Sequence, residues 1–154
     1  MEGTLTRVWV ASVHVRNLER ALLFYREVLG LKVQLDARRY KWVELGPDEP
    51  CTKIGLSEVP KSESGRTGVV TGIVFDTDNI TKLHRKLSAK GVKFTRSPTK
   101  TPWGGLIANF LDPDGNELEV VQDPTHYAQD FPPKGKASIR GQQPPGVSSA
   151  TPTR

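Results

Sequence analysis

The apolar positions along the chain predict a strand, a helix and three further strands, followed by the same order again. In residues 7–14, the side chains of Val8, Val10, Ser12 and His14 fall on one face of a strand and those of Trp9, Ala11 and Val13 on the other. Asn17 follows as a helix N-cap, and Gly30 ends that helix. The apolar residues at helical spacing are Leu18, Ala21, Leu22, Tyr25, Val28 and Leu29. Strands are then predicted over residues 31–35, 40–45 and 52–56.

The second copy begins after residues 58–68, a polar segment with proline, glycine and serines that is typical of a linker. Residues 69–75 form its first predicted strand. Asn79 caps its helix and Gly91 closes it, as Asn17 and Gly30 do in the first copy. Further strands are predicted over residues 106–111 and 117–121. The chain therefore contains two versions of one βαβββ unit, the first at about residues 5–57 and the second at about 69–123.

A polar turn, Asp112-Pro113-Asp114-Gly115-Asn116, joins the last two predicted strands. Pro113 presets one backbone angle and Gly115 accepts a positive one, so the chain folds sharply back. After this turn, Glu119 points to the opposite face from Leu118 and Val120. Glu119 is therefore expected to face away from the buried layer.

The repeated unit predicts an α+β fold in which each copy forms a four-stranded sheet covered on one face by its helix. The other faces of the two curved mixed sheets can then enclose a cleft. The length of 154 residues, 36% of them hydrophobic, suits a single domain, which we assign to residues 1–131. No apolar run is long enough for a membrane span and no signal peptide is recognised, so a cytoplasmic protein is expected.

The net charge of +5 depends on the end of the chain. Residues 132–154 contain Lys134, Lys136, Arg140 and Arg154 without any acidic residue. This segment is rich in Pro, Gly and Ser and lacks hydrophobic periodicity, so we predict a disordered basic tail. Because the rest of the chain is nearly neutral, nucleic acid is not an expected partner.

Two motifs carry a family resemblance. Residues 15–31 read Val-Arg-Asn-Leu-Glu-Arg-Ala-Leu-Leu-Phe-Tyr-Arg-Glu-Val-Leu-Gly-Leu, and Trp103-Gly104-Gly105 leads into Phe-Leu-Asp-Pro-Asp-Gly-Asn-Glu-Leu-Glu at residues 110–119. The chain resembles the vicinal oxygen chelate superfamily, which contains glyoxalase I, bleomycin resistance proteins and extradiol dioxygenases. The resemblance supports the fold above. It does not select an activity, because members include lyases, epimerases, dioxygenases, thiol transferases and proteins that only sequester drugs.

Metal-dependent members of this superfamily place His or Glu ligands on the first, fourth, fifth and eighth strands. The resemblance maps these positions onto Val10, Gly55, Gly72 and Glu119. Valine and glycine side chains cannot coordinate a metal, so we expect no metal and no other cofactor unless the register differs. The three small residues are expected to leave extra space where the ion would sit. His14 cannot replace Val10 as a ligand, because it lies four residues further along the strand, roughly 13 Å away.

Several side chains are candidates for contact with a ligand. Glu119 is the candidate catalytic residue, as an acid, a base or a hydrogen-bond acceptor; its alternative is a carboxylate paired with Lys53 or an arginine. His14 is a ligand contact, a base or an inert residue at the rim of the cleft. Further candidates are Asn109 as a polar contact and Tyr40, Trp42 and Trp103 as flat surfaces, although aromatic residues also serve as ordinary packing.

Two classes of function follow from these expectations. The first is a metal-free protein that binds a small organic molecule in the cleft. The alternative is a glyoxalase- or dioxygenase-like enzyme, a lyase, isomerase or oxygenase, that uses Glu119 with an atypical metal site or as a general base. A third class, an accessory or interaction domain, would bind no small molecule. A homodimer is expected, with the cleft completed either within one chain or between two.

Overall fold

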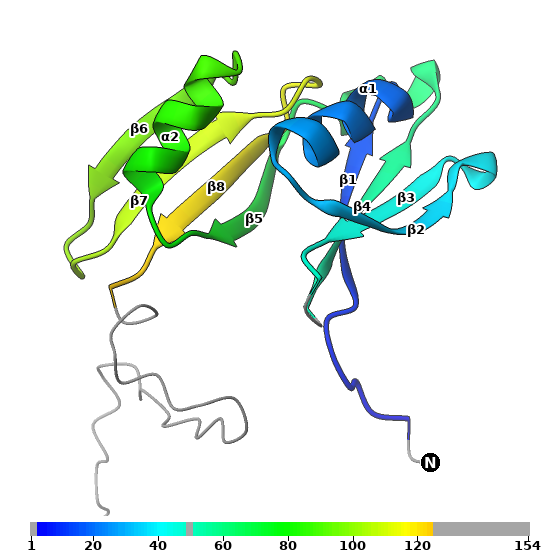
Figure 1. Cartoon of the computed structure of the whole chain (residues 1–154). Coiled ribbons are helices and arrows are strands. Elements are labelled where there is room, and N and C mark those ends of the chain that lie inside the picture. The colour runs from blue at the N-terminus through cyan, green and yellow to red at the C-terminus, as the bar shows by residue number, and fades with distance from the viewer. Residues whose placement is uncertain (1–2, 49–50, 125–154) are drawn as a thin grey trace, which may run out of the picture.

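The chain forms two modules that lie side by side, each with one helix over a four-stranded sheet (Figure 1). The computed structural model describes residues 3–48 and 51–124. The first module contains β1 (Val10–Val15), α1 (Leu18–Leu23), β2 (Lys32–Ala37), β3 (Trp42–Gly46) and β4 (Lys53–Glu58). The second contains β5 (Val70–Asp76), α2 (Ile80–Ala89), β6 (Phe94–Lys100), β7 (Leu106–Leu111) and β8 (Glu117–Gln122).

Both sheets have the same mixed topology. Their strand orders are β1-β4-β3-β2 and β5-β8-β7-β6. In each sheet the first and last strands of the module pair in parallel, and the other neighbours are antiparallel. The predicted fold, two βαβββ units with two mixed sheets, is confirmed. The predicted tail at residues 132–154 lies outside the described residues, and no helix among the described residues is long and apolar enough to cross a membrane.

Each helix begins on an asparagine and is also capped by the last strand of its own module. The side chain of Asn17 accepts a hydrogen bond from the Arg20 N–H at 2.8 Å, and Asn79 does the same for Lys82 at 2.9 Å. The first helical N–H groups are held by the ends of β4 and β8. Leu18 donates to Glu58 Oε2 at 2.9 Å, and Ile80 donates to Gln122 Oε1 at 2.8 Å. These bonds satisfy amide groups that have no partner inside the helix.

Between these elements lie three shorter helical turns: a π-helical turn η1 (Phe24–Val28) and 3₁₀ turns η2 (Arg38–Tyr40) and η3 (Lys61–Arg66). The first of them continues α1, so the helix predicted up to Leu29 is α-helical only to Leu23. The second ends at Tyr40, the first residue of the segment predicted as the third strand. Tyr40 is therefore not on that strand, because the chain turns there and Lys41 takes a positive φ of 60°.

The helices pack on one face of each sheet and leave the other face open. Module one buries Val13, Val15, Leu22, Val43, Leu45 and Leu56; module two buries Ile80, Leu87, Ala108, Phe110, Leu118 and Val120. On the open face of the second sheet, Val70 is 77% exposed and Val74 is 53% exposed. The alternation predicted for the first and last strands of each module is thus present, and in a single chain the open faces remain accessible.

The β7–β8 turn joins the two modules. Asp112 and Asp114 are buried, although both lie in a turn. Asp112 Oδ2 accepts a hydrogen bond from the Tyr25 hydroxyl at 3.0 Å, and Asp114 Oδ1 accepts from Arg16 Nε and Arg20 Nη2, both at 2.9 Å. Burial, followed by the charge of Asp112, raises the pKa of the Tyr25 hydroxyl above its ordinary range, so the hydroxyl stays a donor. The turn thus sets how the two modules meet.

Candidate functional site

A tryptophan lies over a glycine on the open face of the first sheet. Gly55 pairs with Glu44 across the sheet, and Trp42 pairs with Ser57, so these side chains share one face. A Cβ atom at position 55 would lie 2.3 Å from Cη2 of Trp42 and 2.9 Å from Cγ2 of Val10. Only glycine therefore lets the indole ring take this place. The extra space expected at Gly55 is absent because Trp42 fills it.

A buried carboxylate fixes the position of that indole. Glu44 is only 6% exposed, although it is charged and lies on the open face. Its Oε1 accepts from Trp42 Nε1 at 3.2 Å and its Oε2 accepts from Lys53 Nζ at 3.2 Å. Both oxygens are thus satisfied, and Lys53 neutralises the charge that burial would otherwise penalise. The candidate residues chosen from the sequence did not include Glu44. The sequence pattern does indicate its face, because alternation along the strand places Glu44 on the same face as Trp42 and on the other face from Val43 and Leu45.

The second sheet carries its carboxylate on the neighbouring strand. Glu119 pairs across the sheet with Asn109, whose Nδ2 donates to Glu119 Oε2 at 3.3 Å. The other amide atom, Asn109 Oδ1, is buried and has no hydrogen-bond partner in the described part of the chain. Lys53 is bonded to Glu44, and the alternative in which it pairs with Glu119 is not seen among the described residues. Among the described residues no arginine pairs with Glu119 either.

The four positions mapped as metal ligands do not suit a divalent ion. The ring of Trp42 and the side chain of Val10 occupy the space in front of Gly55. Gly72 lies at an irregularity of β5 and has a φ of +71°, and no atom lies within 4 Å of where its Cβ would be. Glu119 is the single donor side chain of the four. Residues 3–48 and 51–124 contain no group of three or more His, Cys, Asp or Glu side chains placed to hold a metal. One carboxylate does not satisfy an ion that requires several oxygen or nitrogen donors.

The remaining candidates are divided between the sheet and its turns. His14 lies on β1, where Arg66 Nη2 is 2.7 Å from its Nε2. A guanidinium can only donate, so a hydrogen bond in this contact runs from Arg66 to His14 Nε2. Tyr40 is 69% exposed in η2. Trp103 lies between β6 and β7 and covers Gly105, where a Cβ would be 1.8 Å from the indole.

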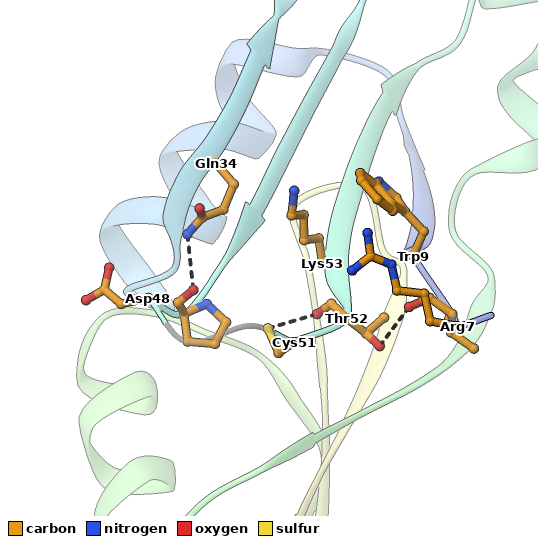
Figure 2. Close-up of a pocket in the computed structure, with 9 residues that line it drawn as sticks. Arg7, Trp9, Gln34, Asp48, Cys51, Thr52 and Lys53 are labelled. Carbon is orange, nitrogen blue, oxygen red and sulfur yellow. Dashed lines mark hydrogen bonds between the residues drawn. The ribbon is translucent and has the colours of Figure 1, made fainter.

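A pocket of about 660 Å³ lies at the end of the first sheet (Figure 2). Its lining is Arg7, Val8, Trp9, Gln34, Pro47, Asp48, Cys51, Thr52 and Lys53. Lys53 links it to the open face, because the same ammonium group holds Glu44. None of these nine residues was among the ligand contacts chosen from the sequence. They come from three separate segments, so only the fold brings them together.

Comparison with known proteins identifies the family. A family model described as the Glyoxalase/Bleomycin resistance protein/Dioxygenase superfamily matches residues 7–120. The chain belongs to this superfamily. The matched range spans both modules, including the Trp42–Gly55 arrangement and Glu119, so both open faces are part of the family domain.

Curated relatives of this superfamily member include proteins with and without a stated activity. The YurT protein of Bacillus subtilis is 31% identical over 127 residues, which cover 75% of this chain and 98% of that protein. The lactoylglutathione lyase GLX1 of Arabidopsis thaliana is 29% identical over 116 residues, 70% of this chain. The match covers only 41% of the lyase, so this chain corresponds to less than half of that enzyme.

Two solved structures have a similar fold. A member from Sphaerobacter thermophilus is 32% identical, with a TM-score of 0.66 over 77% of this chain and 98% of that chain. TnmS3, described as an antibiotic-binding protein from Streptomyces sp. CB03234, is 28% identical, with a TM-score of 0.66 over 79% of this chain and 98% of its own.

Proposed function

We propose that this superfamily member binds a small organic molecule on the open faces of its sheets, without a divalent metal. The observation that carries the proposal is the Trp42 indole lying over Gly55, at a position where metal-dependent members carry a ligand. An indole seated there offers a flat apolar surface in place of a metal donor. Aromatic surfaces with a few fixed polar groups are typical of sites for organic ligands.

The two open faces offer complementary contacts. On the first sheet the indole N–H is already used by Glu44, so Trp42 contributes its apolar ring. On the second sheet Asn109 Oδ1 and the Glu119 carboxylate are acceptors without a cationic partner among the described residues. A guest with an aromatic body and a hydrogen-bond donor matches both faces. Glu119 then anchors or polarises the guest. The description of TnmS3 as an antibiotic-binding protein supports this choice.

We further propose that the protein works as a homodimer. Val70 and Val74 are 77% and 53% exposed on the open face of the second sheet, and Leu35 is 47% exposed on the first. A cleft closed within one chain would cover such side chains. Their exposure favours a cleft completed by the facing sheet of a second copy, which would also bury them. Light scattering tests this: a monomer at micromolar concentration would contradict it.

An enzyme is the second candidate, because a lactoylglutathione lyase is among the relatives. In that case Glu119 is the general base. It is partly buried, and it forms no ion pair among the described residues. An enzyme of this kind needs no metal ligands at Val10, Gly55 and Gly72.

A metal analysis combined with a binding titration tests the proposed function. Protein purified without chelator is expected to contain far less than one equivalent of Mn, Fe, Co, Ni or Zn. The uncharged fluorophore N-phenyl-1-naphthylamine is expected to bind, and Trp42→Ala is expected to weaken it about tenfold through loss of the stacking surface. The matched control is Leu23→Ala, which removes an exposed apolar side chain on the helix side.

Three results would contradict the proposal. One is a stoichiometric metal that is lost in Glu119→Ala. Another is the absence of any binding of the fluorophore. The third is an equal loss of affinity in Trp42→Ala and Leu23→Ala, which would place the probe outside the open faces.

A further inference from the structure

The pocket at the end of the first sheet opens where the β3–β4 connection meets the N-terminal segment. In Figure 2, Gln34 and Asp48 lie on one side, Arg7 and Trp9 on the other, and Lys53 between them. Gly46 lies beside three of the lining side chains. A Cβ at position 46 would lie 3.6 Å from Cys51 Sγ, 3.9 Å from Lys53 Cγ and 4.0 Å from Gln34 Cγ. The missing side chain at Gly46 therefore helps to keep the pocket open.

Two cations meet one aromatic ring in this pocket. The Arg7 guanidinium lies 4.3 Å from the centre of the Trp9 ring, and Lys53 Nζ lies 5.1 Å from it. Such cation–π contacts hold cationic side chains in place without neutralising them. The pocket thus has a prearranged positive wall beside an apolar surface.

Two described acidic groups near the pocket are paired. Asp48, the one carboxylate among the described lining residues, forms an ion pair with Lys32. Glu44 forms its pair with Lys53 at 3.2 Å. Arg7 has no carboxylate partner in the described part of the chain. Among the described residues around the pocket, Arg7 therefore carries a positive charge that no carboxylate balances.

We infer that this pocket binds the anionic group of an aromatic ligand, with Arg7 and Lys53 as donors and Trp9 and Val8 as the apolar wall. The inference rests on the proposed function and adds the class of ligand: a flat ring system with a carboxylate, sulfonate or phosphate. Arginine suits this role because its planar guanidinium donates two parallel hydrogen bonds to such oxygens. Lys53 connects the two regions, so a single ligand reaches from the pocket toward Trp42.

The test uses two probes that share one ring system. 8-Anilinonaphthalene-1-sulfonate carries a sulfonate, and N-phenyl-1-naphthylamine is the same molecule without it. In fluorescence titrations, Arg7→Gln is expected to weaken the sulfonate probe about tenfold and to change the neutral probe by less than about twofold. The matched control is Arg85→Gln, an exposed arginine on α2, which is expected to change neither affinity by more than about twofold.

A second variant tests the pocket itself. Gly46→Leu places a side chain into the space between Cys51, Lys53 and Gln34, and the φ of Gly46 is not positive, so the backbone accepts it. This variant is expected to weaken the sulfonate probe about tenfold or more. Circular dichroism and the thermal midpoint check that each variant is folded.

The outcomes separate this inference from the proposed function. Three results would overturn the inference while the neutral probe still binds. Arg7→Gln could weaken both probes equally, or it could leave the affinity for the sulfonate probe unchanged. Arg85→Gln could weaken the sulfonate probe as much as Arg7→Gln does. Tight binding of the sulfonate probe by folded Gly46→Leu would also overturn it. Failure of both probes to bind the wild-type chain would contradict the proposed function together with the inference.

Discussion

The two modules use the same turn for different purposes. Gly46-Pro47-Asp48 begins on the last residue of β3, and Asp112-Pro113-Asp114 follows the last residue of β7. In the first module the turn is exposed at Pro47 and Asp48, and it borders the pocket. In the second, Asp112 and Asp114 are buried against α1 and its neighbours. An internal repeat thus specifies the backbone twice, while long-range contacts decide what each copy does.

The open faces differ in a similar way. The position equivalent to Glu119 in the first module is Gly55, and the carboxylate is found one strand away at Glu44. Glu44 is neutralised by Lys53 and holds Trp42, whereas Glu119 has an amide partner only. The first sheet therefore presents a rigid aromatic surface and the second an acceptor. Together they describe a site for an organic molecule.

The largest effect on the free energy of unfolding is expected from the two turns, at the aspartates that differ most in burial. Asp114→Ala removes the acceptor of the Arg16 and Arg20 side chains and of the Arg16 N–H, so it is expected to lower the free energy of unfolding by about 3 kcal/mol. Asp48→Ala, at the corresponding position, removes an exposed ion pair with Lys32 and is expected to cost less than about 0.5 kcal/mol.

Urea denaturation at one fixed protein concentration measures both variants, because the stability of an oligomer depends on concentration. Similar losses for Asp48→Ala and Asp114→Ala would contradict the assignment of the second turn as the connection between modules.

The next effect on stability concerns two glycines on neighbouring strands of the first sheet, Gly46 on β3 and Gly55 on β4. Gly55→Ala forces Trp42 away from its place, because the new Cβ would lie 2.3 Å from the ring; a loss of about 2 kcal/mol is expected. Gly46→Ala meets its nearest atom at 3.6 Å and is expected to cost less than about 0.5 kcal/mol. Gly55→Ala should also weaken N-phenyl-1-naphthylamine, and Gly46→Ala should not. A stable Gly55→Ala protein with unchanged affinity would show that Trp42 has no role in binding.

The smallest effect compares the two helix starts. Glu58 and Gln122 hold corresponding N–H groups, but only Glu58 ionises. Bonds from the Leu18 N–H and then from Lys41 lower the pKa of Glu58 from its usual 4.5. The unfolded chain therefore takes up this proton first as the pH falls, and the stabilisation present above about pH 4.5 is lost as the pH falls through the folded pKa.

The variant Glu58→Gln gives the first module the glutamine that the second has at Gln122, and it keeps an oxygen that accepts from the Leu18 N–H. Its free energy of unfolding is expected to fall less steeply below pH 4.5 than that of the wild type, by a difference under about 1 kcal/mol. Urea curves at several pH values between 3 and 7 measure this difference. Parallel pH profiles for the two proteins would show that Glu58 does not contribute in this way.

Local patterns were sufficient to predict the repeat, the asparagine helix caps and the faces of the first and last strands of each module. Glu119 could be placed on the open face because alternation with Leu118 and Val120 is a local property. The place of Tyr40 was wrong because the turn at η2 depends on the positive φ of Lys41, which the sequence does not reveal. Alternation with Val43 and Leu45 could have placed Glu44 on the open face, but its bonds to Trp42 and Lys53 and the role of Gly55 could not be predicted, since they depend on which side chains meet in the folded sheet.

The central claim is that the open faces bind an organic molecule without a metal. The most direct measurement is a titration of N-phenyl-1-naphthylamine into chelator-dialysed protein, with and without added Zn²⁺ or Mn²⁺. The affinities with and without metal are expected to agree within about twofold, since Val10, Gly55 and Gly72 supply no metal donor. Binding that appears only after a metal is added, and that disappears in Glu119→Ala, would contradict it.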